Sequence, residues 1–351
     1  MIRLHRRSLL LAALAVTVPA RALPPLTLRF PRDHGAHPQL RTEWWYITGS
    51  LSSGGREFGF QVTFFRSRVD ATQAMNSKFA AKQLVFAHAA ITDVQGRKLL
   101  HDQRIAREGF GVVAASQEDT AIRLRDWGLR REQGGAYVAQ VAGEEIGLNL
   151  RCEPTQPLLL QGRQGLSRKG PQEQQASYYY SQPQLAVTGS IRLPGRILQV
   201  RGKAWMDHEW SDEVLHADAL GWDWIGMNLH DGSALTAFRL RGKDGASIWD
   251  GGSFRAAAGA PYIFTQGEAV FSPQRRWKSP LSQASYPVEW IVRTPADFYT
   301  VRAVLDDQEL DSRASTGAIY WEGLAHLFDS NGKRVGQGYL EMTGYAQRLR
   351  L

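Results

Sequence analysis

A period-two alternation of apolar and polar residues, broken by glycine turns, constrains the fold of this chain more than any other feature. Phe58, Phe60, Val62 and Phe64 alternate with smaller or polar residues, as expected of a strand with one buried face. Comparable runs cover residues 84–92, 137–141, 146–152, 185–193 and 197–210. Turn sequences separate these runs, and no long amphipathic helix with caps is found. We therefore expect an all-β protein made of antiparallel barrels or sandwiches.

The first 22 residues have the features of an export signal. Three arginines, Arg3, Arg6 and Arg7, precede an apolar run at 9–18, and Ala20-Arg21-Ala22 is a small-x-small cleavage site. The apolar run is too short to span a bilayer. The Arg-Arg pair also fits a twin-arginine signal, so the general secretory and twin-arginine routes both stay open. We expect an exported, periplasmic protein.

Composition excludes several classes of function. Four of the 42 Lys and Arg residues lie in the signal, which leaves 38 against 34 acidic residues and a mature surplus of +4. No basic block accompanies this surplus, so nucleic-acid binding is not expected. There is no phosphate loop, dinucleotide fingerprint or nucleophile elbow, and no His-x-His or cysteine pair suggests a metal. We expect no cofactor and no metal.

The mature length favours two domains, which we place at residues 23–190 and 191–351. A weak internal repeat supports this division. Residues 43–51 contain an acid, tryptophans and an isoleucine before a glycine turn and a strand, and residues 223–240 follow the same plan. Repeats of this kind indicate a duplicated architecture.

The segment from Trp205 to Asp212 has the highest density of chemically active side chains. In a strand, His208 and Trp210 share an apolar face, whereas Asp207 and Glu209 share a charged one. A histidine on an apolar face, tuned by burial and a nearby acid, is a candidate proton donor. The alternative is a hydrogen-bonded core histidine beside a surface ladder of charges, and the sequence does not decide between them.

Other aromatic clusters are candidate ligand contacts. Glu43-Trp44-Trp45-Tyr46 and the tyrosines Tyr178 and Tyr179 could line a pocket. A tryptophan near the first strand also commonly closes one end of a small barrel, and stacked strand aromatics need no ligand. Trp205 and Glu209, from the segment above, complete this set of candidates.

Several of these motifs, in the same order, resemble the AttH and carotenoid 1,2-hydratase-like family of secreted lipocalin-like proteins. The matching segments are residues 41–49, 178–181, 185–189, 204–210 and 221–224. The resemblance covers nearly all of the mature chain and implies two tandem lipocalin-like antiparallel β-barrel domains. It also adds Trp222, Asp223 and Trp224 to the expected ligand contacts.

The resemblance implies a mechanism as well. Carotenoid hydratases of this family protonate a terminal isoprenoid double bond and add water without a cofactor. Their His-x-Trp pair matches His208 and Trp210. Their downstream Tyr-x-Asp has no match here, because the comparable strand is Leu235-Thr236-Ala237-Phe238-Arg239-Leu240. Asp207 or Asp223 would then have to supply the proton.

Two functions therefore stay open. The first is an AttH-type protein that binds a hydrophobic lipid or isoprenoid, accessory to a permease-type membrane transporter. The second is a hydro-lyase that hydrates an isoprenoid double bond, with His208, Trp210 and Asp207 as catalytic residues.

Overall fold

The computed structural model describes residues 22–213 and 215–349, so all of the expected export signal before Ala22 lies outside the described residues. The chain is all-β, as the alternation predicted. Helical structure in the described ranges consists of two short 3-10 helices, η1 (Arg32–His34) and η2 (Asp70–Thr72). No helix in these ranges is long and apolar enough to cross a membrane.

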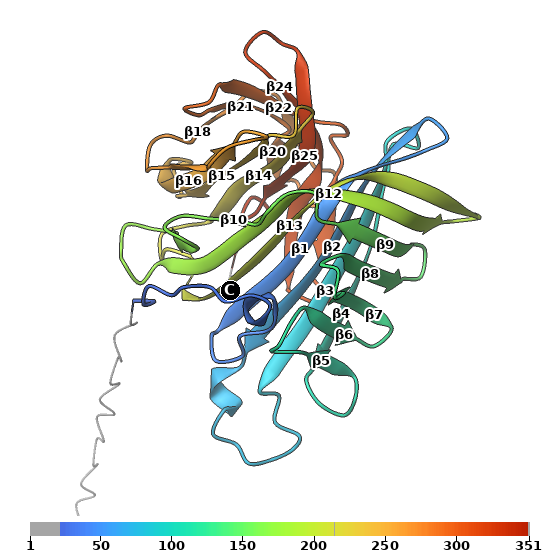
Figure 1. The fold of residues 1–351 in the computed structure, drawn as a ribbon, viewed down its shortest axis with the longest axis vertical. Helices are drawn as coiled ribbons and strands as arrows, with labels where there is room; N and C mark the ends of the chain where they lie inside the picture. The colour runs from blue at the N-terminus through green and yellow to red at the C-terminus, as the bar shows by residue number, and fades with distance from the viewer. Residues whose placement is uncertain (1–21, 214, 350–351) are drawn as a thin grey trace, which may run out of the picture.

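The first sheet contains the strands of the N-terminal part of the chain and is nearly closed into a barrel (Figure 1). Its strands are β1 (Thr42–Ser53), β2 (Arg56–Arg68), β3 (Gln83–Asp93), β4 (Lys98–Arg107), β5 (Val113–Ala115), β6 (Ala121–Leu124), β7 (Trp127–Arg131), β8 (Tyr137–Ala142), β9 (Gly147–Glu153), β10 (Leu159–Leu160), β11 (Leu166–Arg168), β12 (Ala176–Leu193) and β13 (Arg196–Glu213). Their order is β4-β3-β2-β1-β13-β12-β9-β8-β7-β6-β5, and β10 and β11 pair with β12.

The second sheet contains most of the C-terminal strands. They are β14 (Gly221–Leu229), β15 (Ala234–Arg241), β16 (Ser247–Arg255), β17 (Tyr262–Phe264), β18 (Val270–Pro273), β21 (Glu289–Arg293), β22 (Phe298–Ala303), β23 (Glu309–Ser312), β24 (Ala318–Phe328) and β25 (Arg334–Met342). Their order is β17-β16-β15-β14-β25-β24-β22-β21-β18, and β23 pairs with β24. The remaining two strands, β19 (Arg276–Lys278) and β20 (Ser285–Pro287), form a separate hairpin.

The two sheets share one plan. In each, four consecutive strands lie in reverse order, and the first of them pairs with the last strand of its half, β13 in the first sheet and β25 in the second. The register agrees too, because Glu43 on β1 lies opposite Arg66 on β2, and Asp223 on β14 lies opposite Arg239 on β15. The internal repeat in the sequence therefore corresponds to a repeated strand order.

The chain passes from the first sheet to the second between Glu213 and Gly221. The expected boundary at residue 190 falls within β12, and β13 pairs with both β12 and β1 of the first sheet. Alternation could not reveal this, because a strand that returns to pair with β1 has the same local pattern as one that starts a new barrel.

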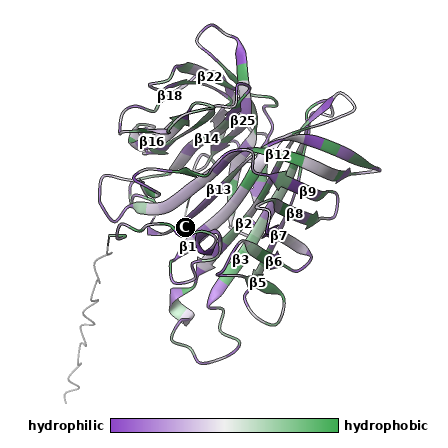
Figure 2. Cartoon of the chain, in the orientation of Figure 1, coloured by the Kyte–Doolittle hydropathy of each residue, from purple (hydrophilic) through white to green (hydrophobic). Residues whose placement is uncertain are grey.

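Each sheet encloses its own apolar core. Phe58, Phe60, Val62 and Phe64, whose alternation predicted a strand, are fully buried in the first. The second core includes Trp290 and Trp321. Colouring by hydropathy shows apolar and polar residues mixed along the strands of both sheets (Figure 2), because each strand also has an outward face.

The outward faces of β1, β13, β14, β24 and β25 meet between the two cores. A third apolar cluster lies there and includes Tyr46, Trp205, Trp224, Leu324 and Tyr339. Figure 1 shows β12 and β13 crossing the middle of the molecule, between the two halves. The face of β13 that carries Asp207 and Glu209 is therefore covered by the second sheet, and is not a surface ladder of charges.

Candidate functional site

A cavity of about 320 Å³ lies where the two sheets meet, a size at the lower end of ligand pockets. We call it the intersheet cavity. Its apolar wall on the first sheet consists of Trp44, Phe65, Leu84, Phe86 and Ile105, and that on the second of Trp222, Trp224, Phe238, Leu240 and Ile319. Four carboxylates, Asp207, Glu209, Glu322 and Glu341, also line it, together with one lysine, Lys169.

Strand parity decides which of the expected site residues reach this cavity. Neighbouring residues on a strand face opposite sides of the sheet. Seven expected residues line the cavity, namely Trp44, Tyr46, Tyr179, Asp207, Glu209, Trp222 and Trp224. The other seven, Glu43, Trp45, Tyr178, Trp205, His208, Trp210 and Asp223, do not line it. The separation of Asp207 and Glu209 from His208 and Trp210 follows the alternation read from the sequence.

Asp207 is held at the cavity wall by three donors. Its Oδ1 accepts hydrogen bonds from Ser181 Oγ at 2.5 Å and Trp205 Nε1 at 2.7 Å, and its Oδ2 accepts one from Tyr179 Oη at 2.7 Å. Burial nevertheless raises the pKa of Asp207 to about 7, against the lowering effect of these hydrogen bonds. A carboxyl group with this pKa can donate or accept a proton near neutral pH. Trp205 thus supports the site without reaching the cavity.

Glu209, the second acid of β13, is neutralised by a lysine. Lys169 Nζ lies 2.9 Å from Glu209 Oε1, and both side chains are almost fully buried. The same ammonium lies 4.5 Å from the ring centre of Tyr179 and 4.3 Å from that of Phe238. Carboxylate and aromatic faces together are a favourable environment for a desolvated ammonium. The sequence gives no indication of this role for Lys169, because the segment 161–177 around it is polar and poor in apolar residues, a composition typical of linkers.

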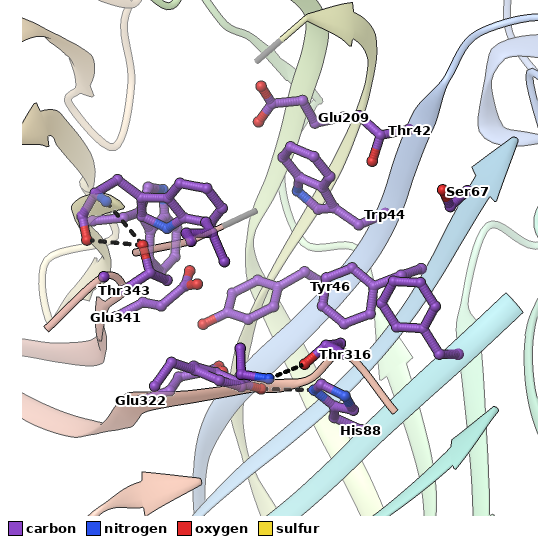
Figure 3. A pocket seen from close by; sticks show the side chains of 18 of the residues that line it. Thr42, Trp44, Tyr46, Ser67, His88, Glu209, Thr316, Glu322, Glu341 and Thr343 are labelled. Carbon is purple, nitrogen blue, oxygen red and sulfur yellow. Dashed lines mark hydrogen bonds between the residues drawn. The ribbon is translucent and has the colours of Figure 1, made fainter. Parts of the chain in front are cut away.

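Glu322 and Glu341 occupy the opposite wall. They are register partners on β24 and β25, and in Figure 3 the hydroxyl end of Tyr46 points towards the side of the cavity where both lie. Burial and the neighbouring Glu341 raise the pKa of Glu322 well above its ordinary value, against the lowering effect of Tyr46 and Tyr320. Burial, together with the charges of Asp207 and Glu209, raises the pKa of Glu341 to about 7, against a hydrogen bond from Trp222.

Sequence reasoning missed both glutamates. The signal that could have identified them is a single acid within an otherwise apolar run, as in Ile319-Tyr320-Trp321-Glu322 and Tyr339-Leu340-Glu341-Met342. That the two glutamates face each other becomes apparent only from the pairing of β24 with β25.

His88 links the two halves at the base of the cavity. Its Nδ1 lies 2.8 Å from Tyr320 Oη and its Nε2 lies 2.8 Å from Ser315 Oγ. Burial lowers the pKa of His88 to about 3, so the ring is neutral near pH 7. It positions the second sheet against the first.

His208 and Trp210 lie inside the first barrel. His208 Nε2 is 2.9 Å from Glu43 Oε1, and Trp45 stacks on its imidazole at a centroid distance of 4.6 Å. Trp210 stacks on His37 at 4.0 Å. Burial lowers the pKa of His208 to about 4, although Glu43 opposes this shift. His208 is therefore a neutral, fully buried histidine that does not line the intersheet cavity.

Glu43 is the centre of that network. Its carboxylate accepts hydrogen bonds from the backbone N–H of His37 and from Arg66 Nε at 2.8 Å. Burial alone would raise the pKa of Glu43, but hydrogen bonds from His208 and His37 hold it well below its usual range. His37, Glu43 and His208 also place three ligand atoms within 4.8 Å of one another, a set that could hold a metal ion. Arg66 already supplies positive charge to Glu43, and this opposes a cation there.

The remaining expected contacts belong to the cores. Asp223 lies on the core side of the second sheet, where Arg239 Nε is 2.7 Å from its Oδ2 and Tyr345 Oη donates to its Oδ1 at 2.9 Å. Asp223 therefore holds an arginine and does not face the cavity. Tyr178 packs against Trp210 and donates to the backbone oxygen of Pro24.

A sequence model of the AttH-like family matches residues 21–345. The chain belongs to the AttH-like family. The crystal structure of a protein from Nitrosomonas europaea assigned to AttH is 46% identical, with a TM-score of 0.86, over 93% of this chain and 99% of that chain. The resemblance noted in the sequence is thereby confirmed. None of the curated proteins matches the chain.

More distant structures share the AttH-like fold. Kievitone hydratase from Nectria haematococca is 13% identical with a TM-score of 0.70, over 94% of this chain and 95% of that chain. CghA in complex with Sch210972 is 11% identical with a TM-score of 0.53, over 87% of this chain and 89% of that chain. At these identities the likeness concerns the fold alone.

Proposed function

We propose that this AttH-like protein binds a hydrophobic small molecule, a lipid or an isoprenoid, in the intersheet cavity. The observation that supports this most is the cavity itself, with aromatic and aliphatic walls from both sheets and a few polar groups between them. Pockets of this composition derive affinity from apolar burial and orientation from a small number of polar contacts. The proposal includes export to the periplasm, on the basis of residues 1–22, and a membrane permease as partner, on the basis of the family resemblance.

The ligand can be sought directly by mass spectrometry of organic extracts from the purified exported protein. Ser67→Trp on β2 places an indole at the cavity wall, and Ser52→Trp on β1 places one on the exposed surface as a matched control. We expect a lipid or isoprenoid to co-purify with the wild type and with Ser52→Trp, and to be depleted in Ser67→Trp. Equal recovery from all three proteins, or none from any, would count against the proposal.

A second candidate function is acid-catalysed hydration of an isoprenoid double bond. The observation in its favour is that Asp207 and Glu341, with pKa values of about 7, both face the aromatic cavity. A protonated carboxyl would transfer its proton to one alkene carbon, and water would add to the resulting tertiary cation. The oxonium would then return a proton to the carboxylate, so that the acid is regenerated and the net change is addition of water. Aromatic faces would stabilise the cation.

Oxygen-18 water distinguishes the two functions. Incubation with an acyclic polyene should incorporate label with the wild type and with His208→Ala, provided that variant folds, but not with Asp207→Asn or Glu341→Gln. If none of the four proteins incorporates label, hydration is wrong and only the ligand-binding function stands. If His208→Ala alone fails to incorporate label, the proton donor is His208 and not the two carboxyl groups.

A further inference from the structure

The two halves of the molecule place equivalent carboxylates around the cavity. Glu209 is the register partner of Trp44 on β1, and Glu341 is the register partner of Trp224 on β14. Each therefore follows the repeated plan of the two sheets, with a tryptophan on the first strand opposite a glutamate on the last. The two positions differ in the charged groups that surround the glutamate.

At the Glu209 position the chain supplies its own cation. The Lys169 ammonium contacts the Glu209 carboxylate and the ring faces of Tyr179 and Phe238. This end of the cavity is therefore an ammonium site built from one carboxylate and two aromatic faces.

At the Glu341 position a second acid takes the place of Tyr179. Tyr179 is the β12 partner of Glu209, whereas Glu322 is the β24 partner of Glu341. Like charges directly opposite each other on neighbouring strands are destabilising. Within residues 22–213 and 215–349, no cation is among the groups that shift the pKa of Glu322 or of Glu341.

Polar atoms at this end are poorly satisfied. Tyr46 Oη and Glu322 Oε1 are buried at the cavity wall, and within the described part of the chain neither makes a hydrogen bond of good geometry, although Tyr46 and Tyr320 lie close enough to Glu322 to lower its pKa. The two carboxyl groups have four oxygens, and the donors near them are Tyr46, Tyr320 and Trp222, all of them neutral, so the complementary group is rich in N–H donors and positively charged. The edge of Tyr46 against Trp224, at a centroid distance of 5.4 Å, adds aromatic surface beside it.

We infer that Tyr46, Glu322 and Glu341 form a subsite for the protonated amine of an amphipathic ligand whose apolar body fills the rest of the intersheet cavity. The inference rests on the proposed ligand-binding function and specifies the polar end of the ligand. A primary ammonium supplies three donors and one positive charge, which a hydroxyl cannot. The Lys169 ammonium at the equivalent position shows that the same combination of groups is already used within this protein.

The test uses three probes with the same apolar chain, namely dodecylamine, dodecanol and dodecanoic acid, below the concentrations at which they form micelles. Their affinities are measured by calorimetry and by quenching of tryptophan fluorescence. The proteins are the wild type, Glu322→Gln with Glu341→Gln, Tyr46→Phe, and the matched control Glu289→Gln on β21, outside the cavity. Melting temperatures confirm that each variant is folded.

We expect the wild type and Glu289→Gln to bind dodecylamine about tenfold or more tightly than dodecanol, and dodecanoic acid most weakly; tenfold corresponds to about 1.4 kcal/mol. In the double variant the preference for the amine should disappear, while dodecanol affinity stays within about twofold. If dodecanol and dodecylamine bind equally to the wild type, the amine subsite is wrong and ligand binding stands. If no probe binds, both the subsite and the proposed function are wrong.

Discussion

Glu209 and Glu341 hold equivalent places in the two halves of the molecule, each opposite a tryptophan and each facing the same cavity. Lys169 neutralises Glu209, whereas Glu341 faces a second acid, Glu322. The repeat therefore explains why two glutamates face the cavity from equivalent positions. The departure from the repeat explains why one end of the cavity contains an ion pair and the other end contains two acids. The predictions below test separate parts of this description.

Adjacent tryptophans on β1 should have opposite roles. Trp44 lines the intersheet cavity, whereas Trp45 is 1% exposed in the core of the first barrel. We expect Trp44→Ala to weaken binding of an apolar probe about tenfold. Trp45→Ala should lower the free energy of unfolding by about 3–5 kcal/mol, the usual cost of removing a large buried aromatic. Urea denaturation and probe titration of both variants check this, and equal effects on binding would contradict it.

His208 should matter for stability and not for ligand binding. His208→Ala should lower the free energy of unfolding, because it leaves a cavity beside Trp45 and removes the hydrogen bond that the imidazole makes to the Glu43 carboxylate. Glu43→Gln should lower the free energy of unfolding by more, about 3–5 kcal/mol in total, because it leaves the buried guanidinium of Arg66 without a counter-charge. Both costs are measurable by denaturant unfolding. A fall in probe affinity for folded His208→Ala, with stability unchanged, would show that the histidine acts on the ligand.

Asp207 should make stability depend on pH in a defined direction. Its pKa is raised from 3.8 to about 7 in the folded protein, so between these values the folded state holds a proton that the unfolded state has lost. The contribution of Asp207 to stability therefore falls as pH rises from about 4 to 7, and is constant above about 8.

The difference between wild type and Asp207→Asn removes the contribution of buried histidines such as His88, which has the opposite sign. It also includes a change of the same sign at Glu341, because the charge of Asp207 raises the pKa of Glu341. The melting temperature of Asp207→Asn should rise relative to the wild type as pH increases from 5 to 8. The expected difference in the free energy of unfolding is on the order of a few kcal/mol. A constant difference across this range would mean that Asp207 ionises normally.

The hydrogen bond between His88 and Tyr320 should join the two sheets at the cavity. Tyr320→Phe removes the hydroxyl that lies 2.8 Å from His88 Nδ1. We expect a loss of about 1 kcal/mol in the free energy of unfolding, and a coupling of similar size in a double-mutant cycle with His88→Ala. Additive effects of the two substitutions would show that the contact contributes nothing.

The sequence predicted the all-β class and the faces of individual strands, because alternation at Phe58–Phe64 and at Asp207–Trp210 is a local property. It did not predict that β13 returns to pair with β1, since strand pairing depends on residues far apart in the chain. For the same reason His208 was an attractive catalytic candidate. The face of β13 that carries His208 and Trp210 points into the core of the first barrel. The opposite face, which carries Asp207, packs against the second sheet.

Glu322 and Glu341 illustrate the limit of sequence reasoning most clearly. Each is a single acid in an apolar strand, and only the register of β24 and β25 places them opposite each other. Lys169 lies in a polar segment whose composition resembles a linker, yet it is 6% exposed because β11 pairs with β12 and holds the segment against the second sheet. Composition alone does not report this kind of long-range burial.

Photolabelling tests the central claim, that the intersheet cavity holds the ligand, most directly. A long-chain alcohol bearing a diazirine at its apolar end would be bound, irradiated and located by mass spectrometry of peptides. We predict label on cavity residues of both sheets, such as Trp44, Phe86, Trp224 and Phe238, and its loss in Ser67→Trp. Label confined to residues inside one barrel, such as His208 and Trp210, or spread over the exposed surface, would contradict the account.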